Sequence, residues 1–359
     1  MARVAVLGAS GYTGAEAVRL LSHHPRARVA LATADSSAGQ PLASVFPHLA
    51  RASKSNASDC LALCSLSDSG LLDGSASVDA ALACLPPGTT QDVLSQLPES
   101  LPIVDLSADF RLRDPSTFAS WYNAEHRAPS LQQSSRVVYG LTEFARKSLH
   151  NSARLVANPG CYPTCSQLPI RPLLERGIVN ADSGVIIDAI SGASGAGRSP
   201  RQTTLLCEAG ESAKQYGLPS HRHQPEIEQG LCDSNGHAEV PVAFTPHLGA
   251  FSRGMVATIH AKLRDGFTEH DAQCALEHAY ENERFVRVLP FATPADSNHV
   301  RGSNDAVLCA CPSRLDGYVT LVCAIDNLMK GATAQAVQNL NVMLGFEEQE
   351  GLDYLPMFP

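Results

Sequence analysis

A buried strand, a glycine-rich turn and a helix at the start of the chain constrain its fold most strongly. Residues Arg3–Leu7 form an apolar run that predicts a strand, and the turn GASGYTG follows at residues 8–14. A helical pattern then extends from Ala15 to about Ser22. Glycines let the backbone approach a phosphate, and a helix N-terminus attracts an anion. The glycine spacing is G-x-x-G-x-x-G, so the pattern favours a dinucleotide site while leaving a plain tight turn as the alternative.

Strands and helices continue to alternate through the first half of the chain. Strands are predicted at Arg28–Ala34, Val78–Leu85 and Leu101–Leu106, and a short helix at Gln91–Leu97. This alternation predicts a parallel, doubly wound sheet of the Rossmann type. In such a sheet the residues after the second strand, Asp35–Gly39 here, hold the adenosine ribose.

The second half of the chain has a different sequence pattern, which predicts a mixed, largely antiparallel sheet covered by helices. Helices are predicted at Thr268–Asn282 and from Asn327 to Leu344. A chain of 359 residues is long for one core, so we expect two domains. The first comprises residues 1–157 and is joined by the C-terminal segment 328–359, and the second comprises residues 158–327. The strands expected in the second half are Gly184–Ile190, Ala238–Thr245, Met255–Leu263, Phe285–Leu289, Ala306–Cys311 and Tyr318–Ile325.

A cysteine lies at the junction between the two predicted domains. The strand Arg154–Ala157 ends at the turn NPGCYPT, and Thr164–Glu175 is predicted to be helical with Pro163 at its first position. Cys161 would then lie at a helix N-terminus, where the dipole favours the thiolate and hence nucleophilic catalysis. A free cysteine in a tight turn is as often a small buried hydrophobe, and spacing alone does not choose between the two interpretations.

Two histidines and an arginine offer further chemistry. His221 and His223 flank Arg222 just before a predicted helix, so one of them could be a general acid/base for Cys161, or both could be exposed turn residues. A zinc site that pairs them with Cys161 and Cys165 is the least favoured interpretation.

Arg111 follows a predicted strand end. There it could bind a carboxylate or phosphate with two hydrogen bonds, or pair with Asp109 or Asp114 at the surface. The glycine-rich segment Ser191–Arg198 could be a flexible lid or an anion nest.

Composition narrows the class of partner and compartment. The formal net charge of −9 argues against nucleic acid or an anionic membrane as the main partner, and no apolar stretch approaches the roughly 18 residues of a membrane helix. Eleven irregularly spaced cysteines favour free thiols in a reducing compartment, and we expect no metal site. A strand that begins almost at Met1 leaves no room for a signal peptide. We therefore expect a cytoplasmic protein, or an organellar matrix protein whose leader has been removed.

Eight motifs follow one another along this chain: GASGYTG, LSADFRL, VYGLTE, NPGCYPT, SGASGAGR, HRHQPEIEQ, TPHL and NLMKGA. They resemble, in the same order, those of the N-acetyl-γ-glutamyl-phosphate reductases, semialdehyde dehydrogenases of arginine biosynthesis. The resemblance implies that Cys161 is the nucleophile, that His221 is the acid/base, and that an acyl-phosphate substrate is reduced through a thioester. It also implies a homodimer or homotetramer that associates through the second domain.

The same resemblance implies a cofactor and the residues that bind the two ligands. The cofactor would be NADP. The substrate would contact Arg111, Asn158, Ser194, Gly195 and His223. The cofactor would contact Gly8, Ser10, Gly11, Tyr12, Thr13, Gly14, Ser36, Ser37, Pro86, Ser191, Gly192 and Asn327.

Two positions depart from the family pattern. Pro87 occupies a place where the family often has a histidine, which concerns a minor cofactor contact. Asp35 lies about 20 residues after the glycine turn, where an acidic residue usually binds the ribose hydroxyl of NAD. NADP remains our prediction, with Ser36 and Ser37 at the 2′-phosphate and the Asp35 side chain either turned outward or capping the turn.

Related activities remain as alternatives. Reduction of aspartyl phosphate is disfavoured by the NPGCYPT motif. Reduction of a carrier-linked aminoadipyl or glutamyl phosphate is disfavoured by the acidic net charge. A regulator that binds the cofactor without catalysis is disfavoured by the presence of both Cys161 and His221.

Overall fold

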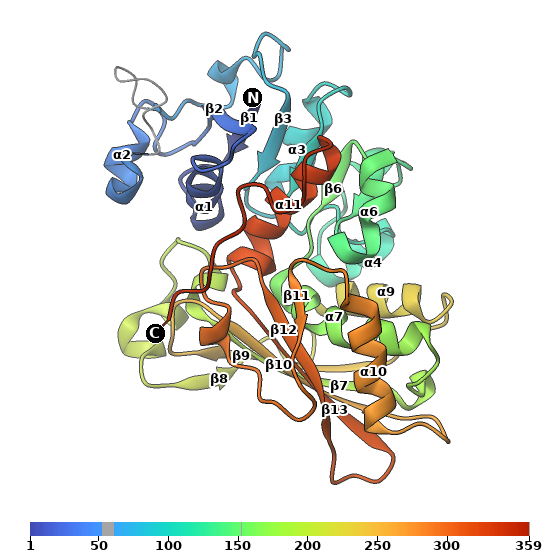
Figure 1. The fold of residues 1–359 in the computed structure, drawn as a ribbon. Coiled ribbons are helices and arrows are strands. Elements are labelled where there is room, and N and C mark those ends of the chain that lie inside the picture. Colours follow the sequence, from blue (N-terminus) through green and yellow to red (C-terminus); the bar gives the residue numbers. More distant parts are fainter. Residues whose placement is uncertain (52–60, 152, 359) are drawn as a thin grey trace. The chain divides into compact units, whose positions relative to one another are not determined.

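The computed structural model describes residues 1–51, 61–151 and 153–358 (Figure 1). The chain forms two compact units. The first comprises Met1–Pro159 and Ala332–Asp353, and the second comprises Gly160–Gly331 together with the residues from Tyr354 onward. The assignment of cofactor binding to one and catalysis to the other remains a prediction.

The first unit is built on a parallel sheet, as predicted, with the strand order β2-β1-β3-β4-β6-β5. Short apolar runs such as AALA in β3 are buried along their whole length, as expected for parallel strands that are covered on both faces. The strands are β1 (Ala2–Leu7), β2 (Ala27–Ala32), β3 (Ala80–Ala83), β4 (Ile103–Asp105), β5 (Val137–Tyr139) and β6 (Leu155–Ala157). The helices are α1 (Tyr12–Leu21), α2 (Leu42–Val45), α3 (Thr89–Gln96), α4 (Pro115–Tyr122), α5 (Pro129–Gln132), α6 (Thr142–Asn151) and α11 (Ala334–Met343).

The second unit contains a mixed sheet with the order β11-β12-β13-β10-β7-β9-β8. The pairs β7–β9 and β11–β12 are parallel and the other pairs are antiparallel, which confirms the predicted mixed, largely antiparallel sheet. Helices α7 and α10 pack on this sheet, and α9 packs on α7 (Figure 1). The strands are β7 (Val185–Gly192), β8 (Ala213–Gln215), β9 (Val242–Gly249), β10 (Met255–Lys262), β11 (Val286–Val288), β12 (Ala306–Pro312) and β13 (Tyr318–Ile325). The helices are α7 (Cys161–Glu175), α8 (Leu206–Ala209), α9 (Gln224–Ser234) and α10 (Glu269–Tyr280).

Helix α7 begins two residues before Pro163, the predicted first position. Gly160 is the N-cap, Cys161 is the first helical residue, and Pro163 lies inside the first turn. A proline is tolerated there because the first N–H groups of a helix have no partner within the helix. Further along, Pro172 removes the N–H that would have bonded Leu168 O, and the Tyr280 hydroxyl donates to that oxygen instead, at 2.5 Å.

Helix α1 begins at Tyr12, three residues before the predicted Ala15, and two boundaries in the second unit were also wrong. The strand expected at Ala238–Thr245 is shifted to Val242–Gly249, because the TPHL segment pairs with β7 on one side and β8 on the other. The helix expected from Asn327 begins with a π-helical turn at Met329–Thr333, in which Gly331 N donates to Asp326 O at 2.9 Å.

Candidate active site

Cys161 lies at the N-terminus of α7 in a closely packed turn. Gly160 N donates to the Glu226 carboxylate at 2.8 Å, and Thr164 N closes the first helical turn on Gly160 O at 2.9 Å. Gly331 lies against the cysteine: a Cβ added at this glycine would be 2.8 Å from Cys161 Cβ. The half-buried Cys161 is therefore held from both sides, and a side chain at position 331 would displace it.

Aromatic and imidazole rings surround the residue after the cysteine. The Tyr162 ring lies 5.6 Å from that of His221, 5.8 Å from that of His223 and 5.3 Å from that of Phe244, all edge-to-face. The two histidine rings are 5.0 Å apart, and Tyr216 lies 5.2 Å from His221. The structure thus places both predicted histidines beside the neighbour of Cys161.

Hydroxyl groups form a chain at this cluster. Tyr216 donates to the Tyr162 hydroxyl at 3.1 Å, and Tyr162 donates to His247 O at 2.9 Å. Burial raises the pKa of Tyr216 to about 12, and the negative charge of the Cys161 thiolate contributes to this rise.

His221 is in a site that favours its neutral form. Burial lowers the pKa of His221 to about 4, and the positive charge of Arg222 adds to the effect. Its Nδ1 accepts a hydrogen bond from His223 N at 3.1 Å. This bond assigns the proton of the neutral ring to Nε2, the nitrogen that can be offered to a substrate.

The second glycine-rich segment, at the end of β7, is fastened by Asn327. The Asn327 side chain donates to Ser194 Oγ at 2.9 Å and accepts from Gly254 N at 2.8 Å. A Cβ at Gly192 would be 2.7 Å from Ser252 O, and a Cβ at Gly195 would be 3.5 Å from Ser191 Oγ. The structure therefore brings together five predicted residues of this segment: Ser191, Gly192, Ser194, Gly195 and Asn327.

In the first unit, the turn after β1 fits a phosphate. The neighbouring strands β1 and β3 form the switch point of this strand order, where doubly wound sheets bind ligands. Gly8 has a φ of +79°, and a Cβ there would be 2.6 Å from Cys84 O at the end of β3. Gly11 is the N-cap of α1, and Gly14 packs against the backbone of Gly8.

The remaining predicted cofactor residues of this unit lie around the same turn. Tyr12 and Thr13 begin α1, Ser10 precedes it, and the exposed Pro86 follows β3. Side chains at Gly8 and Gly14 would clash with neighbouring backbone, so the glycines let this turn pack closely before the N-terminus of α1, where a dinucleotide phosphate would fit.

The structure of the turn after β2 excludes one of the two arrangements expected for the Asp35 side chain, in which it caps the turn. Ala38 N donates to the backbone oxygen of Asp35 at 3.2 Å, so the turn is closed by the main chain and not by the carboxylate. Asp35 is exposed, as is Ser36, while Ser37 is half-buried.

Arg111 and Asn158 are buried and hold the chain just before Cys161. Arg111 donates from Nε to Asn158 O at 2.8 Å and from Nη2 to Leu106 O at 2.9 Å. The Asn158 side chain donates to Ala332 O at 3.0 Å and accepts from Asn339 at 3.1 Å. The side chains of Arg111 and Asn158 thus stabilise the turn that precedes Cys161.

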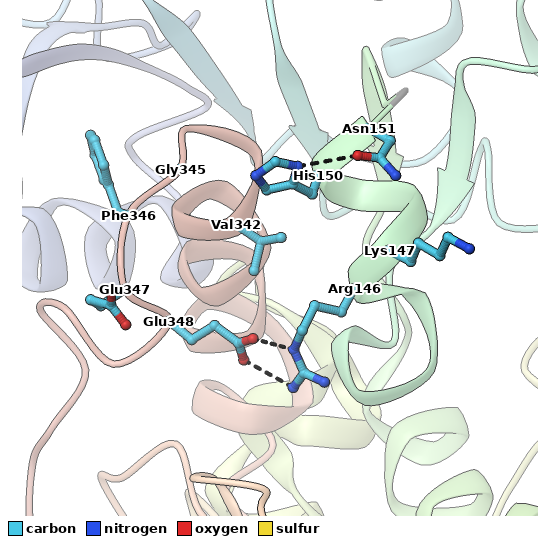
Figure 2. A pocket seen from close by; sticks show the side chains of 9 residues that line it. All are labelled: Arg146, Lys147, His150, Asn151, Val342, Gly345, Phe346, Glu347 and Glu348. Carbon is cyan, nitrogen blue, oxygen red and sulfur yellow. Dashed lines mark hydrogen bonds and ion pairs between the residues drawn. The ribbon is translucent and has the colours of Figure 1, made fainter.

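Other features fall outside these clusters. A cavity of about 480 Å³ is lined by α6, the end of α11 and the segment after it, and no predicted site residue lines it. Figure 2 shows the side chains around this cavity, among which Arg146 pairs with Glu348. In the described part of the chain, we find no group of three or more histidine, cysteine or acidic side chains placed to hold a metal. Within those same residues, no helix is long and apolar enough to cross a membrane.

Sequence reasoning missed four residues of the site: Tyr162, Tyr216, Glu226 and Gly331. Tyr162 was within the NPGCYPT motif and Glu226 and Gly331 were within other motifs, but nothing in their spacing indicates that they meet. Only the fold brings these separate segments together.

Comparison with known proteins agrees with this architecture. Residues 3–152 match the family described as semialdehyde dehydrogenase, NAD binding domain. Residues 161–327 match the family described as semialdehyde dehydrogenase, dimerisation domain. The second match begins at the nucleophile candidate itself.

Full-length relatives are similar over nearly the whole chain. A protein of Oryza sativa subsp. japonica named probable N-acetyl-gamma-glutamyl-phosphate reductase, chloroplastic, is 48% identical over 99% of this chain and 82% of its own length. The N-acetyl-gamma-glutamyl-phosphate reductase of Rhodospirillum rubrum is also 48% identical, over 99% of this chain and 98% of its own.

Among solved structures, aspartate semialdehyde dehydrogenase II of Vibrio cholerae has a TM-score of 0.68 at 12% identity, covering 96% of this chain and 98% of that one. An NADP-bound aspartate semialdehyde dehydrogenase of Candida albicans has a TM-score of 0.67 at 14% identity, with the same coverage. These structures share the fold.

Proposed function

This chain belongs to the N-acetyl-γ-glutamyl-phosphate reductases of the semialdehyde dehydrogenase family, and we propose that it reduces N-acetyl-L-glutamyl 5-phosphate with NADPH. The products are N-acetyl-L-glutamate 5-semialdehyde and phosphate. The main support is Cys161 at the N-terminus of α7, followed directly by Tyr162, whose ring packs against that of His221.

The reaction is divided into acyl transfer and reduction. The Cys161 thiolate attacks the acyl carbon, a C–S bond forms, and the bond to the phosphate oxygen breaks as phosphate leaves. Reduction of the thioester carbon requires a hydride, which a bound nicotinamide would supply. The resulting adduct expels Cys161 as a thiolate and releases the aldehyde, so that the nucleophile is regenerated.

We assign the acid/base role to His221, acting from Nε2. With a pKa of about 4 the ring is neutral at pH 7. Its Nε2–H is then available to the oxygen that gains negative charge in each tetrahedral adduct.

The other substrate contacts are proposals that follow the family motifs. Ser194 and Gly195 lie on the loop held by Asn327, and His223 adjoins His221. Arg111 is a buried cation in the segment after β4, where it donates to two backbone oxygens, and it is proposed to contact the substrate's anionic groups. Asn158, in the turn before Cys161, is also proposed to contact the substrate.

NAD(P) binding belongs to the first unit, and we propose that NADP is preferred over NAD. The loop after β2 offers the Ser36 and Ser37 hydroxyls for the 2′-phosphate. Because Asp35 does not cap the turn, its carboxylate is proposed to point into water.

We propose a homodimer or homotetramer that associates through the second unit. Support comes from the dimerisation-domain match over residues 161–327 and from the sheet face opposite α7. On that face Ile186, in the middle of the sheet, is 46% exposed, and its strand neighbours are half-buried or exposed. We propose a cytoplasmic or organellar location, and note that the relatives from Oryza sativa and Arabidopsis thaliana are named as chloroplastic.

One assay tests the function. The purified protein, given N-acetylglutamate semialdehyde, phosphate and NADP, should produce NADPH only when all three are present. Aspartate semialdehyde and a carrier-linked aminoadipate semialdehyde serve as comparison substrates. Faster turnover of either one, or turnover without phosphate, would contradict the proposal.

A further inference from the structure

Glu226 is a buried carboxylate that contacts the nucleophile's turn. It lies in the first turn of α9, is 1% exposed, and accepts from Gly160 N at 2.8 Å. A carboxylate is buried at high cost unless it is hydrogen-bonded, and a bond to an ionised acceptor is stronger than one between neutral groups. This contact therefore fixes the N-cap residue that directly precedes Cys161.

The same helix begins at the two histidines. Gln224 N donates to His221 O at 2.9 Å, and Ile227 N donates to His223 O at 3.0 Å, so the first turn of α9 is continuous with the histidine segment. Glu226 thus joins the segment that carries His221 to the turn that carries Cys161.

A second hydrogen bond joins α9 to α7. Gln167 of α7 is fully buried and donates from Nε2 to Glu226 O at 3.4 Å. One turn further along α9, Gly230 leaves space that the Gln167 amide occupies, and any side chain there would overlap it. The main chain of α9 at Glu226 is therefore packed directly against α7, the helix that begins at Cys161.

We infer that Glu226 is a positioning residue, whose buried carboxylate sets the geometry of Cys161 relative to His221 by holding the Gly160 N–H. The inference rests on the proposed function for its kinetic consequence, but not for the contact itself. It also has an electrostatic consequence, because a carboxylate next to the nucleophile's turn opposes ionisation of the thiol. Removing the charge and removing the hydrogen-bond acceptor should therefore have separable effects.

Two variants separate these effects, and a third serves as a control. Glu226→Gln keeps an oxygen acceptor without the charge, and Glu226→Ala removes both. Glu228→Gln is the matched control, since Glu228 lies on the same helix and accepts from Gln224. The readouts are kcat, KM and the pH dependence of Cys161 alkylation by iodoacetamide, followed by peptide mass spectrometry.

We expect the Cys161 alkylation midpoint to move to lower pH in both Glu226 variants and to stay unchanged in Glu228→Gln. Glu226→Ala should lose about tenfold or more in kcat, consistent with the loss of a hydrogen bond to a charged group, with little change in KM. Glu226→Gln should retain most of the wild-type kcat.

Three results would overturn the inference: wild-type kcat in Glu226→Ala, equal losses in the Ala and Gln variants, or a raised KM with unchanged kcat, which would indicate a substrate contact. The alkylation profile needs no substrate. A failed assay of the proposed reaction would therefore leave this test intact.

Discussion

At the scale of single residues, the site depends on where one sulfur is held. Cys161 is confined between the α7 N-cap and Gly331, and His221 is kept neutral by burial. Replacing Cys161 with Ser should abolish turnover while fold and cofactor binding remain, because an alcohol lacks a thiolate's nucleophilicity at neutral pH. Turnover and NADPH fluorescence titration measure the two effects.

The exposed Cys207 of the same unit supplies the control. Cys207→Ser should behave as the wild type. An acyl group trapped by mass spectrometry on any cysteine other than Cys161 would contradict the assignment.

The low pKa of His221 has a consequence for stability. Its pKa is about 4 in the folded chain and about 6.5 when unfolded, so the unfolded state binds more protons between these values. Stability from this residue is complete above pH 6.5 and is lost as the pH falls towards 4. Compared with His221→Asn, the wild type should therefore lose more unfolding free energy between pH 7 and pH 5 in urea titrations. Parallel losses in the two proteins would show that the folded-state pKa is not lowered.

At the scale of elements, sequence patterns predicted which segments form helices and strands more accurately than they predicted the residues at which these elements begin. The helix after Thr268 was predicted to within two residues, and in the structure Thr268 and Asp271 form a capping box at its start. The start of α7 was misplaced, since Pro163 is acceptable both as the first residue and within the first turn. Strand β8 was not predicted at all: it is short and polar, and only its pairing with β9 defines it.

The residues of the candidate site likewise divide into those that the sequence indicated and those that it did not. Motifs indicated Cys161, His221 and the glycine turns, since nucleophiles and tight turns have local signatures. Tyr216 and Glu226 have none, because their importance comes from packing between segments distant in sequence.

The loop after β2 carries the prediction on cofactor choice. Asp35→Ala should change the ratio of NADP to NAD affinity little, since the exposed carboxylate does not cap the turn. Ser37→Ala should weaken NADP binding about fivefold and leave NAD binding unaffected, as expected for one lost hydrogen bond. Fluorescence titration with both cofactors measures these ratios. A native preference for NAD that Asp35→Ala shifts towards NADP would mean that the carboxylate governs the site.

At the scale of the whole molecule, the open sheet face predicts how copies associate. Ile186→Arg places a charge on this face, and burying an unpaired charge is costly. We expect a smaller mass by size-exclusion chromatography with light scattering and an unchanged circular dichroism spectrum. Ile186→Val is the control and should associate normally. An unchanged mass in the arginine variant would place the interface elsewhere.

The two units also differ in the parts of the chain that each needs in order to be complete. The second is formed mainly by one continuous stretch, residues 160–331, whereas the first lacks α11 until residues 332–353 have been added. Asn339 of α11 is fully buried and bonds Gly140, Thr142 and Asn158, so the first unit has unsatisfied polar groups until then. During synthesis, which proceeds from the N-terminus, the second unit, which holds Cys161, can therefore fold before the first unit is finished. The unit whose synthesis starts first is then the unit completed last, because it needs residues 332–353.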